Sequence, residues 1–221
     1  MIERKATKCA LSKLMFANDE KILHIGFHCE KIIKTKALGL QVYCVDADTL
    51  SMMQEPVLKY DKVLTFACWD VAKKPQESFD NGARLLKRYG QFCAVLPYYK
   101  SPYIDIYYQT FMNDTWKEFY DNDKEVKLCG SRAIKKLFEG AGIGDRIACE
   151  IIKKPFIFKT KEKFMTWIAS YSSELNGIIP QERQVEFMND VINNYLEKYP
   201  VAEDQSIKLY LPYMIVSGYK S

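Results

Sequence analysis

The sequence predicts a mixed α/β fold whose central sheet is mostly parallel. Short apolar runs alternate along the chain with segments of helical spacing, and the first two runs are joined by a crossover of helix length. The apolar runs also lack the polar alternation of half-exposed strands, which is typical of a parallel sheet covered on both faces. We therefore expect one domain that spans residues 1–221.

The first half of the chain supplies the opening strands. Ile22–Ile25 is a short apolar run that ends at Gly26, Glu30–Leu38 has helical spacing, and Leu40–Val45 is a continuous apolar run. Strand, helix and strand in so short a stretch form a right-handed βαβ unit. Two further strands and the helix between them are expected at Lys62–Cys68, Gln91–Leu96 and Gln76–Lys87.

After Pro97 the sequence becomes aromatic and irregular up to about residue 130. A helix is expected to begin at Ser131 and to stop at Gly140 and Gly142. The remaining expected elements are a strand over Arg146–Phe158 that is broken near Pro155, helices over Lys161–Tyr171 and after Pro180, and a final strand interrupted by Pro212.

Composition narrows the classes of partner. Lys and Arg number 32 against 28 Asp and Glu, and no block of five or six basic residues occurs, so we expect neither a nucleic-acid nor a membrane partner. The sequence shows no apolar run of transmembrane length and no signal core, which favours a cytoplasmic protein. The cysteines number seven, and Cys44, Cys68 and Cys93 lie in apolar runs, which favours reduced thiols.

The order of these elements resembles the class I S-adenosylmethionine-dependent methyltransferases. The stretch "YDKVLTFACWDVAKKPQESFDNGARLLKRYGQFCAVL" is similar to their fourth strand, following helix and fifth strand, with Lys87-Arg88-Tyr89-Gly90 where "KPGG" is usual. Segments such as "PYIDIYYQTFMNDTWKEF" and "LPYMIVSGYK" are similar to the arthropod juvenile hormone acid methyltransferases. The resemblance implies a Rossmann-like sheet with an aromatic helical cap, formed by residues of about 98–130 and 160–200.

The resemblance also implies S-adenosylmethionine as cofactor and O-methylation of a small apolar carboxylic acid, isoprenoid or fatty. It places the cofactor near His24, Gly26 and Phe27, near Asp46 and Ala47, and near Cys68 and Trp69. Asp46 follows a strand of the predicted sheet and so lies where open α/β sheets bind ligands, although it is equally suited to cap a helix.

The predicted cofactor loop departs from the family at the end of the first strand. Where the family has an acidic residue followed by a glycine-rich turn, this chain reads His24-Ile25-Gly26-Phe27-His28-Cys29. Glycine is used in such turns because it lets the backbone approach the ligand and adopts positive φ without strain. Phe27 therefore predicts a steric block, and His24 replaces the carboxylate that helps to order the amino acid end of the cofactor.

A second departure is one of length. From Asp46 to Val63 the chain has 63 − 46 = 17 positions, too few for the helix, strand and acidic loop that a complete family member holds there. Either Val42–Val45 is the second strand and the third is lost, or it is the third and the second is lost. We prefer the first, because His24 and Asp46 are separated by 46 − 24 = 22 positions, close to the family spacing.

Several aromatic residues are candidates for an acceptor site. Trp69, Tyr98, Tyr103 and Tyr107 offer apolar surface with polar tips, as the wall of an isoprenoid cavity would. Packing within a cap explains the same tyrosines, and we favour it slightly. His24, His28 and Cys29 lack the second ligand pair of a metal site, so no metal is expected.

The sequence thus predicts a methyltransferase-like protein in which the ancestral acid O-methylation is impaired or lost, and whether it is an enzyme stays open. The alternative is a pseudoenzyme that binds a small lipid or a partner protein without catalysis. A third interpretation is an incomplete product that relies on a partner to cover the missing element. A homodimer that protects an exposed sheet edge is compatible with each.

Overall fold

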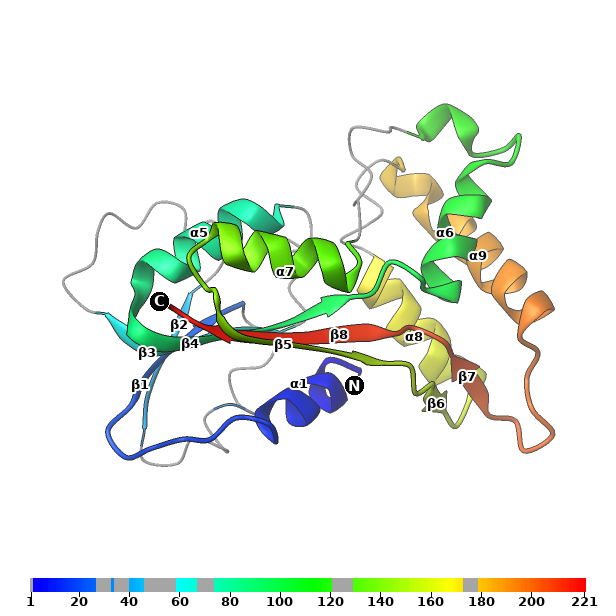
Figure 1. Cartoon of the computed structure of the whole chain (residues 1–221). Coiled ribbons are helices and arrows are strands. Elements are labelled where there is room, and N and C mark those ends of the chain that lie inside the picture. The colour runs from blue at the N-terminus through cyan, green and yellow to red at the C-terminus, as the bar shows by residue number, and fades with distance from the viewer. Residues whose placement is uncertain are drawn as a thin grey trace. The chain divides into compact units, whose positions relative to one another are not determined.

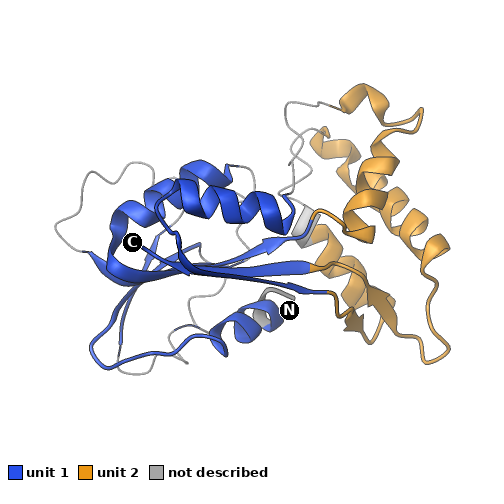
Figure 2. Cartoon of the chain, viewed as in Figure 1, with its two compact units in different colours: residues 1–98, 127–152, 213–221 blue, residues 99–126, 153–212 orange. Residues whose placement is uncertain are grey.

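The computed structural model describes residues 2–26, 33, 40–45, 59–66, 74–120, 129–172 and 179–221 (Figure 1). The chain divides into two compact units (Figure 2). The first unit consists of Met1–Tyr98, Lys127–Ile152 and Tyr213–Ser221, and the second of Tyr99–Val126 and Lys153–Pro212. Most of both segments that were expected to form a cap falls in the second unit.

The first unit contains a six-stranded sheet with the order β2-β1-β3-β4-β8-β5. Four neighbouring strands are parallel, and β8 runs antiparallel between β4 and β5. This arrangement confirms the expected α/β class with a mostly parallel sheet. The strands are β1 (Lys21–Ile25), β2 (Gln41–Val45), β3 (Tyr60–Phe66), β4 (Leu86–Pro97), β5 (Asp145–Ile152) and β8 (Tyr213–Tyr219).

Strand β2 pairs directly with β1, and Cys44 lies opposite His24. In doubly wound sheets the second strand is the one that adjoins the first on this side. The pairing alone does not decide between the second-strand and third-strand interpretations of Val42–Val45, so the preference for the second strand stays a prediction. The interval in which a third strand was expected to be missing falls within residues 46–58, which lie outside the described residues.

Helices cover both faces of this sheet (Figure 1). α5 (Pro75–Leu85) and α7 (Ser131–Gly140) pack on one face, and α1 (Ile2–Leu11), which the sequence analysis did not anticipate, packs on the other. The core between α5, α7 and the sheet contains Phe79, Phe92 and Phe138, whose ring centroids lie 4.6 to 5.7 Å apart in edge-on pairs. Such edge-to-face geometry adds to the free energy gained by burying the rings.

Two lysines explain where α5 ends. The last carbonyls of a helix have no partner within it. Lys220 Nζ donates to the carbonyl oxygen of Ala83 at 2.7 Å, and Lys59 Nζ donates to that of Arg84 at 2.6 Å. β4 then begins at Leu86, whereas the sequence predicted that the helix would continue to Lys87.

The second unit combines helices with a two-stranded sheet. Its elements are α6 (Pro102–Phe111), η1 (Lys117–Phe119), β6 (Phe156–Phe158), α8 (Lys161–Ser172), η3 (Gln181–Arg183), α9 (Gln184–Lys198) and β7 (Ile207–Leu209). β6 and β7 pair antiparallel.

Helix α6 corrects the expectation of an irregular stretch after Pro97. Ser101 caps the helix, because its hydroxyl accepts a hydrogen bond from the backbone N–H of Ile104 at 3.4 Å. Pro102 occupies the first helical position, where its fixed φ suits the helix. A serine and a proline before Tyr103 were therefore the start signal that sequence reasoning overlooked.

Tyr195 joins α9 to β7 in the core of the second unit. Its hydroxyl donates to the carbonyl oxygen of Lys208 at 3.0 Å and accepts from the backbone N–H of Tyr210 at 2.8 Å. Burial raises the pKa of the Tyr195 phenol, while the bond from Tyr210 opposes that rise. The surrounding core is built from the aromatic rings of Tyr103, Tyr107, Phe111, Trp116, Phe158, Phe164, Trp167 and Phe187.

Candidate functional site at the carboxyl edge of the parallel strands

Gly26 forms the turn at the carboxyl end of β1. Its φ is +111°, a conformation that side-chain-bearing residues rarely adopt. Its backbone N–H donates to the carbonyl oxygen of Val45 at 2.7 Å, which holds the turn against the end of β2. The predicted role of Gly26 as a backbone turn is therefore consistent with its geometry, and its role toward a ligand stays a prediction.

His24 lies inside the sheet, two residues before this turn. It pairs in register with Cys44 of β2 and Leu64 of β3, and none of its surface is exposed. Its ring centroid lies 6.1 Å from that of Phe66. An imidazole carries no negative charge in either protonation state, so His24 cannot perform the charge-pairing role of a carboxylate.

Thr65 is a buried polar residue near this edge that sequence reasoning missed. It lies opposite Ile25 in the register of β1 with β3, and its side chain is 1% exposed. Within the described part of the chain its hydroxyl oxygen has no hydrogen-bond partner. Burying a hydroxyl without a partner costs about 1–3 kcal/mol. A single polar residue inside the apolar run "KVLTFAC" was the available signal.

His24 and Thr65 face opposite sides of the sheet. Thr65 pairs with Ile25, which belongs to the core beneath α5 and α7, whereas His24 alternates with Ile25 along the strand. The edge therefore carries one buried polar group on each side of β1 and β3.

Five of the seven residues of the predicted cofactor site lie outside the described residues. These positions are Phe27, Asp46, Ala47, Cys68 and Trp69. Their proposed roles stay predictions, and so does the steric block expected from Phe27.

The three predicted acceptor-site tyrosines belong to two units. Tyr98 packs against the core of the first unit. Tyr103 and Tyr107 are 0% and 1% exposed in the second unit, where their ring centroids lie 6.5 Å apart. Burial raises the pKa of the Tyr107 phenol above its usual range. This close packing agrees with the interpretation of both rings as core of the cap, and a role in substrate binding stays a prediction.

The described residues fit S-adenosylmethionine only in part. Gly26 has the turn conformation that a cofactor loop requires, and β1 and β2 end side by side. His24, by contrast, offers no negative charge to the ammonium group of the cofactor's amino acid end. The described part of this edge therefore has a turn conformation compatible with a cofactor loop, but position 24 carries no carboxylate.

No group of three or more His, Cys, Asp or Glu side chains is placed to hold a metal ion among the described residues. Likewise, none of the helices in that part of the chain has the length and apolar character needed to cross a membrane.

Comparison with solved structures identifies the fold. A putative methyltransferase from Bacillus halodurans matches with a TM-score of 0.54 at 16% identity, over 99% of this chain and 98% of that one. Phosphoethanolamine N-methyltransferase 2 from Haemonchus contortus, in complex with phosphomonomethylethanolamine and S-adenosylhomocysteine, matches with a TM-score of 0.57 at 12% identity. That match covers 98% of this chain and 52% of the other.

A third match is an S-adenosylmethionine-dependent methyltransferase from Geobacter sulfurreducens in complex with S-adenosyl-L-homocysteine. Its TM-score is 0.50 at 12% identity, over 98% of this chain and 89% of that one. No protein-family model and no curated protein sequence matches the chain. The comparisons therefore establish the Rossmann-like class I methyltransferase fold.

Proposed function

We propose that this chain is a methyltransferase-like protein whose ancestral O-methylation of a small apolar carboxylic acid is impaired or lost. The fold supports the methyltransferase class, because solved neighbours with this architecture include methyltransferases crystallised with S-adenosylhomocysteine. The observation that carries the loss is His24, fully buried in β1 two residues before the turn at Gly26. The sequence resemblance places a carboxylate at that position.

The reasoning rests on charge. S-adenosylmethionine carries an ammonium group at its amino acid end, and a carboxylate favours that group whereas an imidazole is neutral or cationic. Hydrogen bonds to charged groups contribute about 1.5–3 kcal/mol, so losing one weakens binding by roughly 10- to 100-fold. A cofactor held this weakly leaves the acid without a methyl donor.

Isothermal titration calorimetry with S-adenosylmethionine and S-adenosylhomocysteine tests this proposal. We expect no binding, or binding only near millimolar concentrations, for the natural chain. Micromolar binding, or transfer of a labelled methyl group to farnesoic or lauric acid, would contradict it. His24→Asp places a carboxylate at this position and is expected to raise the affinity for the cofactor. His24→Asn is the matched control, because asparagine has the shape of aspartate without its charge.

Both variants place a new polar group in a buried strand, so their folding must be checked by circular dichroism. If neither folds, the titration of the natural chain still decides whether the cofactor binds. If His24→Asp folds and gains no affinity over His24→Asn, charge at this position is not the defect, and the interval between Asp46 and Val63 becomes the explanation to test.

A further inference from the structure

The second unit carries a cluster of lysines within one short segment. Between Lys153 and Lys163 the sequence "KKPFIFKTKEK" contains five lysines and one glutamate, a net charge of 5 − 1 = +4. The formal net charge of the whole chain is also +4, so the remaining residues are neutral on balance. All five lysines are exposed.

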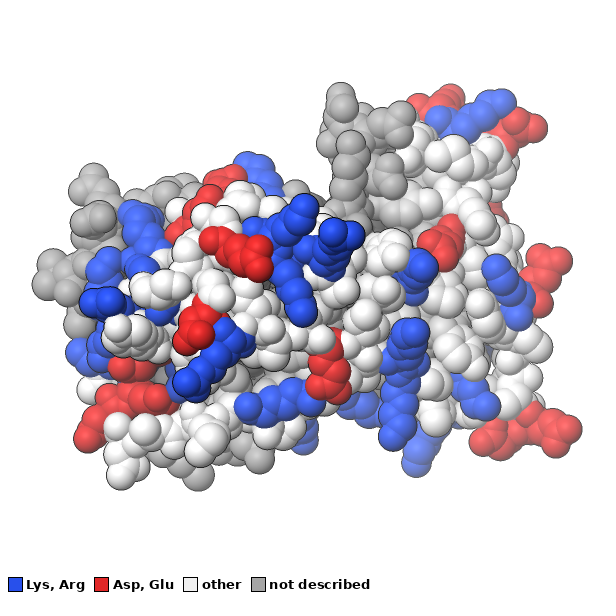
Figure 3. Space-filling view, in the orientation of Figure 1, with Lys and Arg blue, Asp and Glu red and all other residues white. Residues whose placement is uncertain are grey.

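Strand pairing adds a sixth lysine from a distant part of the sequence. Lys208 of β7 lies directly opposite Ile157 of β6, and both side chains are exposed. We call the following residues the lysine patch: Lys153, Lys154, Lys159, Lys161, Lys163 and Lys208. Figure 3 shows Lys and Arg side chains gathered over the part of the chain that Figure 1 labels β6.

The lysine patch is not neutralised by ion pairs. Within the described residues, every ion pair joins other lysines or arginines to carboxylates, and none involves a member of the patch. The nearby acidic residues are Glu162 within the segment and, in the turn before β7, Glu203 and Asp204. Positive charge therefore predominates on this surface.

An exposed apolar side chain lies within the patch. The neighbours of Ile157 along β6, Phe156 and Phe158, point into the core of the second unit, whereas Ile157 is 52% exposed. This β-branched side chain is therefore only partly packed against its own unit, and it lies beside Lys208. It is suited to enter an apolar environment outside the protein.

We infer that the lysine patch, with Ile157 within it, docks on an anionic phospholipid surface. Groups of four to eight basic residues are the size that anionic lipid headgroups attract. The cations are all lysines, which act as hydrated point charges toward diffuse negative charge and do not make the bidentate phosphate contacts of arginine. Ile157 then reaches the boundary between headgroups and acyl chains.

A nucleic-acid surface fits these observations less well. Proteins that bind single strands stack bases on exposed aromatic rings. Here the rings between the lysines, Phe156 and Phe158, are buried. The lysines do not form a continuous run in the sequence, which led to the expectation of no membrane partner, and the pairing that brings in Lys208 is visible only in the fold.

Vesicle co-sedimentation of the full chain tests this inference. Phosphatidylcholine vesicles with and without phosphatidylserine serve as the two surfaces, at low and at physiological salt. We expect partition onto the phosphatidylserine vesicles only, weakened by salt because surface charges are screened. Each lysine contributes about fivefold to partition, so Lys153→Gln, Lys154→Gln and Lys208→Gln together are expected to reduce it by about a hundredfold.

The matched control removes three other exposed lysines. Lys8→Gln, Lys135→Gln and Lys136→Gln change the net charge equally in the first unit and are expected to leave partition within about twofold. Ile157→Ser alone is expected to reduce partition by about tenfold or less, without altering its salt dependence.

Three results would overturn the inference. Absence of partition onto either vesicle would do so directly. Equal losses in the patch variant and the control would show that net charge alone is responsible. Retention on heparin or polyadenylate without any vesicle binding would reassign the surface to a polyanionic partner.

Discussion

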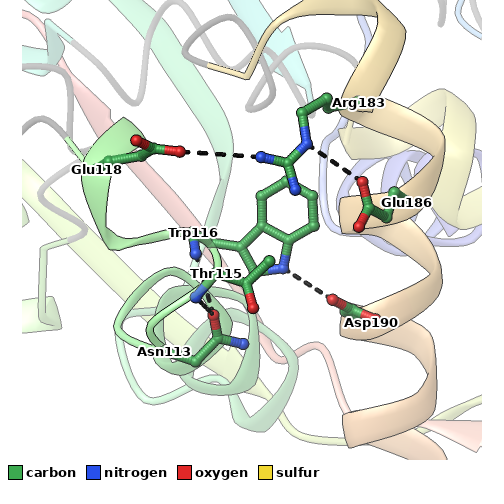
Figure 4. A network of polar contacts seen from close by, with 7 residues as sticks. All are labelled: Asn113, Thr115, Trp116, Glu118, Arg183, Glu186 and Asp190. Carbon is green, nitrogen blue, oxygen red and sulfur yellow. Dashed lines mark hydrogen bonds and ion pairs between the residues drawn. The ribbon is translucent and has the colours of Figure 1, made fainter.

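The indole N–H of Trp116 donates a hydrogen bond of 2.8 Å to the carboxylate of Asp190, which follows it by 74 positions in the chain (Figure 4). The guanidinium group of Arg183 lies 4.3 Å from the centre of the Trp116 ring, and Arg183 also pairs with Glu186 at 3.2 Å. Trp116 is fully buried. These contacts hold the segment before η1 against α9.

The bond between Trp116 and Asp190 is expected to be the contact of this network that contributes most to stability. Trp116→Phe keeps a ring but leaves Asp190 without its donor, and we expect the free energy of unfolding to fall by about 1–3 kcal/mol in urea titrations. Glu186→Gln is the control on the same helix, since exposed pairs contribute at most about 1 kcal/mol. If both variants lowered the free energy of unfolding equally, the hydrogen bond from the indole would contribute no more than the exposed ion pair.

Tyr89 occupies a turn conformation that suits glycine. Its φ is +62°, and it lies in "KRYG", where the resemblance has a glycine at the same position. Its side chain is 65% exposed, so little packing is lost by removing it. We expect Tyr89→Gly to raise the free energy of unfolding by about 0.5–1 kcal/mol, measured by thermal and urea unfolding.

Arg88→Gly is the control for that experiment. It places glycine one residue earlier, where no positive φ requires it, and is expected to lower stability by roughly 0.5–1 kcal/mol. If both variants were destabilised alike, the backbone of Tyr89 would not be strained.

Gly82 is in contact with Phe92. A Cβ atom added to Gly82 would lie 2.2 Å from Cε2 of the Phe92 ring, far inside contact distance. We expect Gly82→Ala to lower the free energy of unfolding by about 1–3 kcal/mol, even though alanine favours the helix. Near-ultraviolet circular dichroism should change as well, because the aromatic rings of Phe79, Phe92 and Phe138 must move.

Gly140→Ala is the control that separates the effect of helix propensity from the steric clash expected in Gly82→Ala. At this position the new Cβ meets only the side chain of Gln76 at 3.6 Å. The same substitution in α7 is therefore expected to be neutral or to raise stability by up to about 1 kcal/mol. A destabilised Gly140→Ala would refute the steric account of Gly82.

The buried thiol of Cys93 makes the free energy of unfolding depend on pH in the alkaline range. Complete burial raises its pKa from 9.0 to about 12. The folded state therefore keeps a proton that the unfolded state releases between these values, so stability is full below pH about 9 and is lost as pH rises toward 12.

Urea unfolding at a series of pH values measures this loss. One such thiol contributes a slope of about 1.4 kcal/mol per pH unit within the window. Cys93→Ala is expected to flatten the decline by about that amount, although it lowers stability at neutral pH through the lost contacts. An unchanged slope would mean that other groups, such as the buried tyrosines, dominate the alkaline transition.

The elements that the sequence predicted correctly are those whose signal is local. Continuous apolar runs marked β1, β3 and β4, and Gly140 with Gly142 marked the end of α7. Helix α6 was missed because its aromatic residues obscured the helical period, although Ser101 and Pro102 marked its start. Five lysines of the patch are visible in the sequence, but the sixth could not be predicted, since strand pairing alone brings Lys208 beside Ile157.

The candidate site was predictable only in part. The sequence correctly predicted that a first strand contains His24 and ends at a turn at Gly26. Thr65 was overlooked since one hydroxyl in an apolar strand has no periodic signature. The contribution of Asp46 depends on side-chain placement outside the described residues.

The position of β8 has a consequence for synthesis of the protein. β8 lies between β4 and β5 and hydrogen-bonds to both, yet it follows both of them in the chain. Because the ribosome adds roughly 5–20 residues per second, β8 is made on the order of ten seconds after β4. Throughout that time the nascent sheet exposes the strand edges that β8 later covers, so a chaperone that shields β-edges is expected to raise the yield of folded protein.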